Sequence, residues 1–154
     1  MAEKEPHIIE ARLYVPYQNM FGALASQFFC QLRDHKRLMG TRCIPCKKVY
    51  MPPRSVCPGC FGQLSEWVEL PPTGTLLTYT IVNYTYSTYY QPKQAPYPIG
   101  IIKLDGADTG MTHLLGEVQP EDIKIGMRLQ AVFREPREGN ILDIAYFRPA
   151  QLGS

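Results

Sequence analysis

The sequence lacks most of the signals that define familiar catalytic and membrane classes. No apolar run among its 154 residues approaches the roughly 18 residues that a membrane-spanning helix needs. The first residues are charged, without the apolar stretch of a secretory signal. A Gly-x-Ser-x-Gly elbow, a Walker loop, a GxGxxG fingerprint and an HExxH helix are all missing, and no serine or cysteine adjoins any of the three histidines. We therefore expect a cytoplasmic protein that has no membrane association and is not catalytic alone.

Long helices are also disfavoured, because 14 prolines and 12 glycines divide the chain into short pieces. The hydrophobic fraction of 45% and the charged fraction of 19% are ordinary for a globular chain. The net charge of +2 is distributed unevenly, since residues 33–54 carry seven basic side chains and one acidic side chain. This segment is either a solvated basic face or a site for a small anionic ligand, rather than an extensive nucleic-acid surface.

Four of the five cysteines form two Cys-x-x-Cys pairs, Cys43 with Cys46 and Cys57 with Cys60, separated by ten residues. Two such pairs can place four thiolates around one tetrahedral ion, and thiols that stay reduced in the cytoplasm favour a metal over disulfides. Zinc is the expected ion, with iron in a rubredoxin-like redox site as the alternative. Because four ligands fill the coordination shell, the zinc would be structural. Cys30 stands apart and is predicted to be a buried cysteine in a helix.

The order of patterns along the chain predicts a mainly β protein. We expect a helix over residues 20–38, with Met20, Leu24, Phe28 and Leu32 at i, i+4 spacing. This stripe packs on the chain's own core or docks on another protein. Turn signals then separate five strand-like segments, at residues 75–86, 97–104, 111–118, 127–135 and 140–147. Five short strands without room for crossover helices predict a small closed barrel, an oligonucleotide/oligosaccharide-binding (OB) fold.

We divide the chain into an N-terminal helical hook (1–38), a zinc ribbon (39–70) and a C-terminal five-stranded OB-fold barrel (71–154). Six of the ten tyrosines lie between Tyr79 and Tyr97. Tyrosine is enriched where proteins meet partners, although a packed lid on the barrel would also explain this cluster. The span between Arg54 and Lys93 contains no Lys or Arg. Single-strand binders combine cations with aromatic stacking platforms, so a nucleic-acid partner is disfavoured.

Several segments resemble the acyl-CoA-associated OB-fold protein family, whose members carry a rubredoxin-like zinc ribbon. The segments are LMGTRCIPC (38–46), MPPRSVCPGC (51–60), GTLLTYTIV (74–82), APYP (95–98) and IKIGM (123–127). The resemblance covers roughly residues 22–149, and the PPRxxCPxC run together with IKIGM is its specific part.

The resemblance implies a non-catalytic accessory subunit of a heteromeric thiolase-type acyltransferase complex. Such a subunit supports a thiolase-fold catalytic partner, which carries the catalytic residues, and helps to form its CoA or acyl-CoA channel. The alternatives are a subunit of a hydroxymethylglutaryl-CoA synthase or aldolase assembly, and a zinc-ribbon/OB-fold nucleic-acid-binding protein. Richness in tyrosine favours a bulky aromatic acyl group, as in aromatic degradation.

Under this resemblance, one set of side chains is expected to contact CoA and a second set is expected to contact the partner or line an acyl pocket. Arg and Lys suit the phosphates of CoA because they form charge-assisted hydrogen bonds to them. The candidates for the CoA phosphates are Arg42, Lys47, Lys48 and Arg54, with Arg33, Lys36 and Arg37 as second choices. The candidates for contact with the partner or for an acyl pocket are Phe21, Phe28, Tyr84, Tyr86, Tyr89 and Tyr90.

Overall fold

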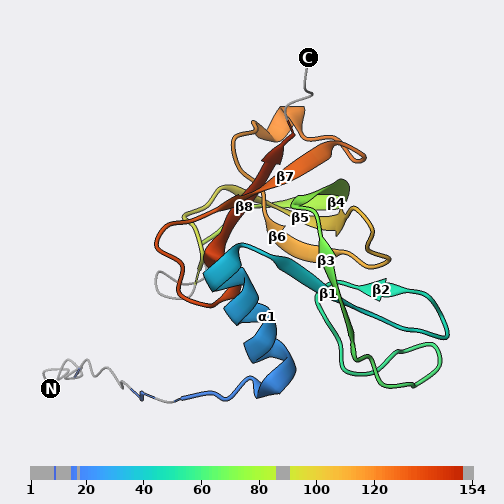
Figure 1. Ribbon diagram of the computed structural model, residues 1–154. Helices are drawn as coiled ribbons and strands as arrows, with labels where there is room; N and C mark the ends of the chain where they lie inside the picture. Colours follow the sequence, from blue (N-terminus) through green and yellow to red (C-terminus); the bar gives the residue numbers. More distant parts are fainter. Residues whose placement is uncertain (1–8, 10–14, 17, 86–90, 151–154) are drawn as a thin grey trace, which may run out of the picture.

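The computed structural model describes residues 9, 15–16, 18–85 and 91–150, and within them it is mainly β with one α-helix (Figure 1). The elements in chain order are α1 (Gly22–His35), β1 (Leu38–Arg42), β2 (Val49–Tyr50), β3 (Glu66–Leu70), β4 (Thr73–Val82), β5 (Tyr97–Leu104), β6 (Met111–Leu114), the 3-10 helix η1 (Pro120–Asp122), β7 (Arg128–Phe133), the 3-10 helix η2 (Ile141–Asp143) and β8 (Ile144–Pro149). In this part of the chain, no helix combines the length and apolar character needed to cross a membrane.

The helix α1 is shorter at both ends than the predicted residues 20–38. It begins at Gly22, whose φ of 76° lies in the left-handed region that glycine adopts readily. It ends before Lys36, which has φ 57° and donates its N–H to the Leu32 carbonyl over 3.1 Å. A left-handed residue that satisfies a late carbonyl is a common helix terminator.

Only one face of α1 is buried. Phe28 is 3% exposed and Leu32 is fully buried, and the helix packs against β1 and η2. Phe28 therefore belongs to the chain's own core, and its assignment as a partner or acyl-pocket contact is wrong. The prediction of a buried Cys30 is also wrong, because Cys30 is exposed. It lies two residues, or about 200° around the helix, from both Phe28 and Leu32 and so points the other way.

The ribbon is a three-stranded antiparallel sheet in the order β2-β1-β3. β1 pairs along its whole length with β3, from Leu38 opposite Leu70 to Arg42 opposite Glu66. β2 is only two residues long and pairs with the end of β1. The first pair of cysteines follows β1, and the second pair precedes β3, whose first residue Glu66 lies opposite Arg42 at the end of β1, so both pairs lie towards the same end of the ribbon.

The OB-fold part is a five-stranded antiparallel sheet in the order β6-β5-β4-β7-β8. A bridge between Leu115 and Phe147 connects the segment after β6 to β8, which closes the sheet into a barrel. The five strands overlap the predicted segments, but β4 begins at Thr73 and β8 ends at Pro149, each two residues beyond the prediction. β6 ends at Leu114 rather than at residue 118, and residues 141–143 form η2 rather than the start of the last strand. The side chain of Asn140 accepts the N–H of Leu142 over 2.8 Å, and this cap favours a helical turn there.

The helix, the ribbon and the barrel share one hydrophobic core. Phe28 and Leu32 come from α1, and the barrel contributes the largest group of buried side chains. The ribbon adds four residues to the same cluster, namely Leu38, Val49, Met51 and Leu70. Burial of this shared surface fixes the ribbon against the barrel.

Candidate metal centre and binding surfaces

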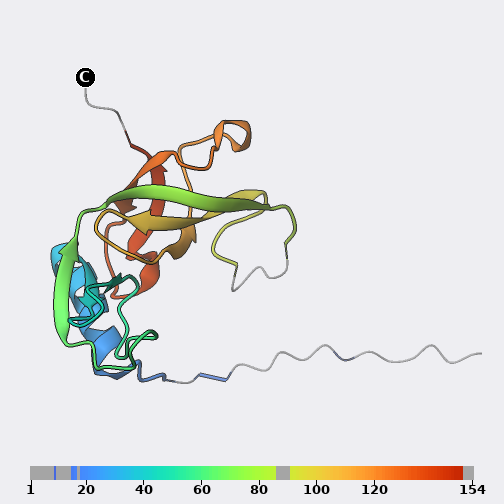
Figure 2. The same ribbon diagram turned by 90° about the vertical axis from the view of Figure 1, so that its right-hand side faces the viewer.

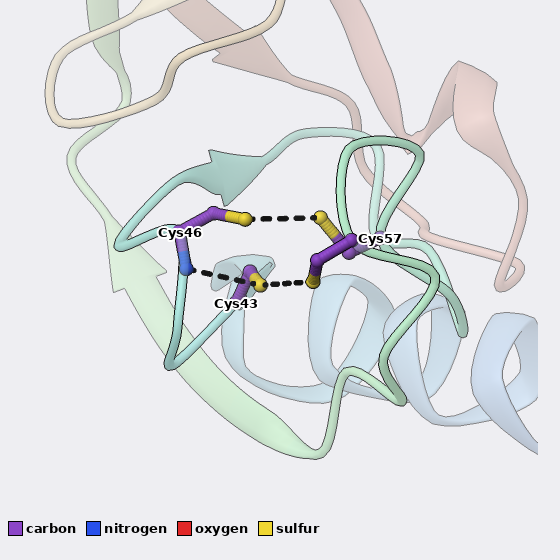
Figure 3. A group of neighbouring side chains, drawn as sticks. Cys43, Cys46 and Cys57 are labelled. Carbon is purple, nitrogen blue, oxygen red and sulfur yellow. Dashed lines mark hydrogen bonds between the residues drawn. The ribbon is translucent and has the colours of Figure 1, made fainter.

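Two tight turns bring Cys43, Cys46, Cys57 and Cys60 together in space. Figure 3 labels Cys43, Cys46 and Cys57 and shows their side chains pointing toward one another. Their four Sγ atoms all lie within 4.8 Å of one another. The Cys43–Cys60 pair of sulfurs is 3.4 Å apart and the Cys46–Cys57 pair is 3.9 Å apart. In a tetrahedron with zinc–sulfur bonds of about 2.3 Å, neighbouring sulfurs lie about 3.8 Å apart. The four side chains therefore fit one tetrahedral metal ion.

Both turns close in the same way. Cys43 donates its backbone N–H to the Lys48 carbonyl over 2.8 Å, and Cys57 donates to the Gly62 carbonyl over 2.9 Å. The residue after the second cysteine of each pair is left-handed, with φ 58° at Lys47 and 59° at Phe61. This conformation is uncommon for residues with a side chain and indicates that the surrounding turn enforces it.

The donor set decides what the metal can do. Four sulfur ligands complete a tetrahedral shell, which leaves no position for a bound water or substrate, so the ion has a structural role. Soft thiolates suit zinc and iron better than magnesium or calcium. Thiols must lose their protons to bind, so metal affinity falls at low pH.

A buried tyrosine contacts the cluster from β2. The Tyr50 hydroxyl lies 3.3 Å from Cys57 Sγ, and Tyr50 is only 4% exposed. This hydrogen bond raises the pKa of Tyr50 to about 12 and is the main reason that the pKa of Cys57 is lowered. The pKa of Cys46 is raised, because its thiol hydrogen-bonds to the neighbouring thiols. The four cysteines are therefore not equivalent. Nothing in the sequence pattern distinguished them.

Most of the basic residues in residues 33–54 have acidic partners. The ion pairs are Arg33 with Asp34 (2.7 Å), Lys36 with Glu135 (2.8 Å), Arg37 with Glu69 (3.4 Å) and Arg42 with Glu66 (2.9 Å). Three of these four acids lie outside the segment, so the sequence alone overstated how many of its positive charges are unpaired. Arg42 and the three second-choice cations are thus engaged with carboxylates of the same chain.

Lys47, Lys48 and Arg54 are exposed, and within the described residues they form no ion pair. All three lie on the ribbon. The Arg54 guanidinium is 5.9 Å from the centre of the Tyr50 ring, at cation–π distance. Lys48 borders a hollow of about 370 Å³ beside Cys46 and Tyr50. These three side chains are the part of the basic segment that is open to an anion.

The aromatic candidates that the structure describes do not lie together. Phe21 is 68% exposed and precedes α1, whereas Tyr84 is 69% exposed and follows β4. The start of α1 and the far end of the β4–β5 hairpin lie on opposite sides of the molecule in Figure 2. Tyr86, Tyr89 and Tyr90 lie outside the described residues.

A surface that the sequence analysis missed lies on the outer face of β4, β5 and β6. Residues directly opposite one another on antiparallel strands share a face. The pairing aligns Thr78, Ile101 and Thr112 in one row and Thr80, Ile99 and Leu114 in the next. All six side chains are uncharged, and five of them line a hollow of about 320 Å³. The alternation of Thr with other residues along β4 was the signal that could have identified this face.

The buried histidine of the barrel has a structural role. His113 is 5% exposed, and its Nδ1 accepts the N–H of Leu114 over 2.9 Å. Nε2 therefore carries the proton and donates to the Ile141 carbonyl over 3.2 Å. Burial lowers the pKa of His113, so the neutral ring is favoured. With both ring nitrogens bonded to the backbone, this imidazole links β6 to η2.

A four-cysteine ribbon that shares its core with a five-stranded OB barrel defines the class of this protein. Two family models match it: the ChsH2 rubredoxin-like zinc ribbon domain over residues 31–65 and the ChsH2 C-terminal OB-fold domain over residues 67–134. The chain belongs to the DUF35 family, which includes ChsH2. The predicted resemblance, the fold and the structural zinc ribbon are thereby confirmed.

Relatives of known description agree with this family. A DUF35 domain-containing scaffold protein of Methanocaldococcus jannaschii is 36% identical over 70% of this chain and 74% of the relative. A scaffold protein of the same description from Pyrococcus furiosus is 32% identical over 80% of this chain and 91% of the relative. A probable enoyl-CoA hydratase alpha subunit of Thermomonospora curvata is 28% identical over 80% of this chain, which spans 37% of that protein.

Among solved structures, an Ltp2-ChsH2(DUF35) aldolase is similar in fold. Its matching chain has a TM-score of 0.60 and 24% identity, over 80% of this chain and 93% of that one. A DUF35 family protein of Sulfolobus solfataricus, described as of unknown function, has a TM-score of 0.56 and 25% identity, over 72% of this chain and 78% of that one.

Proposed function

We propose that this chain is the non-catalytic accessory subunit of a heteromeric acyl-CoA enzyme, and that its partner is a thiolase-fold catalytic subunit. The observation that carries the proposal is the uncharged patch that Thr78, Thr80, Ile99, Ile101, Thr112 and Leu114 form on the outer face of β4, β5 and β6, on a chain whose relatives are named scaffold proteins. The relative described as an enoyl-CoA hydratase subunit supports an acyl-CoA substrate. The fold shared with an Ltp2-ChsH2 aldolase favours an aldolase as the second candidate partner.

The geometry of β4 supports a role in assembly. β7 pairs with β4 only at Thr73, Gly74 and Thr75. Among the described residues, no strand lies beside residues 77–82 of β4 on the side away from β5. Proteins usually protect such an edge with charges, prolines or a covering element. Here the edge borders the uncharged patch, and an open edge beside such a patch is typical of a surface that a partner covers.

The ribbon supplies the second part of the proposal. Lys47, Lys48 and Arg54 are exposed and have no acidic partner in the described part of the chain. We expect them to contact the phosphates of CoA when the partner is bound, because cations form charge-assisted hydrogen bonds to phosphate. An aromatic acyl group is the expected substrate, on the strength of the tyrosines between Tyr79 and Tyr97.

The proposal predicts that a neighbouring gene encodes a thiolase-fold enzyme, and co-expression of that enzyme with this chain tests the pairing. The two proteins are expected to elute together from a size-exclusion column, and the large subunit alone is expected to lose activity. Ile101→Lys places a charge between Thr78 and Thr112 in the uncharged patch and is expected to weaken pairing at least tenfold. Ile125→Lys is the matched control, because Ile125 is 67% exposed and lies outside that patch. Separate elution with full activity of the large subunit would refute the proposal.

Calorimetry of the assembled complex with CoA and with dephospho-CoA tests the phosphate contact. Lys48→Ala is expected to weaken CoA binding several-fold, and the loss should be larger in buffer of low ionic strength. Lys124→Ala removes an exposed lysine that follows η1, away from the ribbon, and serves as the control. Equal affinities for wild type and Lys48→Ala would exclude Lys48 from the CoA site without affecting the pairing result.

A further inference from the structure

The outer edge of β2 is bound by the barrel. The turn after β5 supplies Asp108 and Thr109, which meet the backbone of Val49 and Met51. Val49 donates its N–H to Asp108 Oδ2 over 2.8 Å, and Asp108 donates its own N–H to the Val49 carbonyl over 2.8 Å. The Thr109 hydroxyl accepts from the Met51 N–H over 2.8 Å and donates to the Met51 carbonyl over 2.9 Å. We name these four hydrogen bonds the β2 clasp.

Tyr50 lies between the two residues that the clasp holds. On its other edge, Tyr50 pairs with Thr41 of β1. Its backbone is thus held between β1 and the barrel turn, while its side chain extends to the cysteine cluster. The hydroxyl lies 3.3 Å from Cys57 Sγ, and the side chain is 4% exposed.

We infer that Tyr50 is a positioning residue of the metal centre, and that the β2 clasp makes the barrel part of the structure that holds the metal. A hydroxyl that donates to a thiolate ligand stabilises the negative charge on sulfur and fixes the side chain's orientation. Partners in this outer shell usually change metal affinity by about 10–100-fold. The inference concerns the ribbon and barrel alone and does not depend on the proposed catalytic partner.

Zinc release from the full-length chain tests the role of Tyr50. The rate is measured by transfer to a chromogenic chelator in excess. Tyr50→Phe keeps the ring and deletes only the hydroxyl, and it is expected to release zinc at least tenfold faster than wild type. Tyr146→Phe is the matched control, because it deletes a hydroxyl that donates to Glu117 over 2.6 Å, away from the cysteines. Its release rate is expected to equal that of wild type.

A spectroscopic measurement separates positioning from general loosening. In the cobalt-substituted protein, the sulfur-to-cobalt charge-transfer band reports the electron density on the ligating sulfurs. Loss of a hydrogen bond to Cys57 is expected to move this band to lower energy in Tyr50→Phe and not in Tyr146→Phe. An unchanged band together with an unchanged release rate would overturn the assignment of Tyr50. Loss of zinc from Tyr50→Phe during purification, with full zinc retention by Tyr146→Phe, would support it.

Substitutions in the barrel turn test whether the β2 clasp helps to hold the metal. Thr109→Val keeps the shape of the side chain and removes both hydrogen bonds to Met51, so zinc release is expected to accelerate several-fold. Thr109→Ser retains the hydroxyl and is expected to restore the wild-type rate. If Tyr50→Phe accelerates release and Thr109→Val does not, the clasp does not hold the metal and the second half of the inference is wrong. If Thr109→Val fails to fold, a wild-type rate in Asp108→Ala, which removes the acceptor of the Val49 N–H, would refute it instead.

Discussion

Replacement of Phe28 by Ala tests whether α1 belongs to the core or to a docking surface. Phe28 is 3% exposed, and its ring centre lies 5.2 Å from that of Phe29. Truncation removes almost the whole buried ring and leaves a cavity, so the free energy of unfolding is expected to fall by about 3–5 kcal/mol. In a chain of this size each 1 kcal/mol lowers the melting temperature by about 2–4 °C. The expected decrease is therefore roughly 6–20 °C, measured by circular dichroism on the zinc-loaded protein.

Phe21→Ala is the matched control at the N-cap of the same helix. Phe21 is 68% exposed, and its described ring contact is an edge-on approach to Phe29 with 5.8 Å between ring centres. Its loss is expected to cost about 1 kcal/mol or less. If Phe21 instead contacts the catalytic partner, the variant pairs less tightly while its melting temperature stays near that of wild type. Equal destabilisation by the two substitutions would refute the division of α1 into a buried and an exposed part.

Three further predictions concern the metal, a buried carboxylate and an exposed ion pair. Cys57→Ser is expected to release the metal and unfold the ribbon; full zinc retention by elemental analysis would contradict the assignment. Asp143, which is fully buried, accepts the N–H groups of Glu138 (2.8 Å) and Gly139 (2.7 Å), so Asp143→Ala is expected to cost about 3 kcal/mol in denaturant unfolding. The hydrogen bonds from Arg128 lower the pKa of Asp105 to about 2 from its usual value near 3.8. Because the folded-state pKa is the lower one, this stabilisation is complete above about pH 4 and is lost as the pH falls towards 2. Arg128→Met is expected to lose less stability over that interval; an identical pH dependence in thermal unfolding would contradict this account.

The metal ligands could be predicted from the sequence because their geometry is local. Each Cys-x-x-Cys pair is placed by one tight turn, and the spacing of the two pairs leaves few other arrangements. The strands of the barrel were predictable for a related reason, since turn residues mark their ends. Even so, the side-chain cap at Asn140 converted the start of the last predicted strand into a helical turn.

The interpretation of the basic segment was less accurate because ion pairs depend on tertiary structure. Arg37 meets Glu69 and Lys36 meets Glu135 only after the chain has folded. The same reason applies to Tyr50, whose contact with Cys57 requires β2 to lie against the second cysteine turn. Hydrophobic periodicity correctly indicated a helix, but it did not show that Phe28 is buried while Phe21 remains exposed.

The shared core has a consequence for the thermodynamics of the chain. A ribbon that buries Leu38, Val49 and Leu70 in the same cluster as Leu76 and Ile102 cannot melt without exposing the barrel's apolar interior. Zinc is then a stabilising ligand for the whole chain, since any ligand that binds only the native state raises its free energy of unfolding. A single cooperative transition is the expected result, with a midpoint that rises with the concentration of free zinc. An ion held by four cysteines at one end of the molecule would in this way raise the free energy of unfolding of a sheet at the other end.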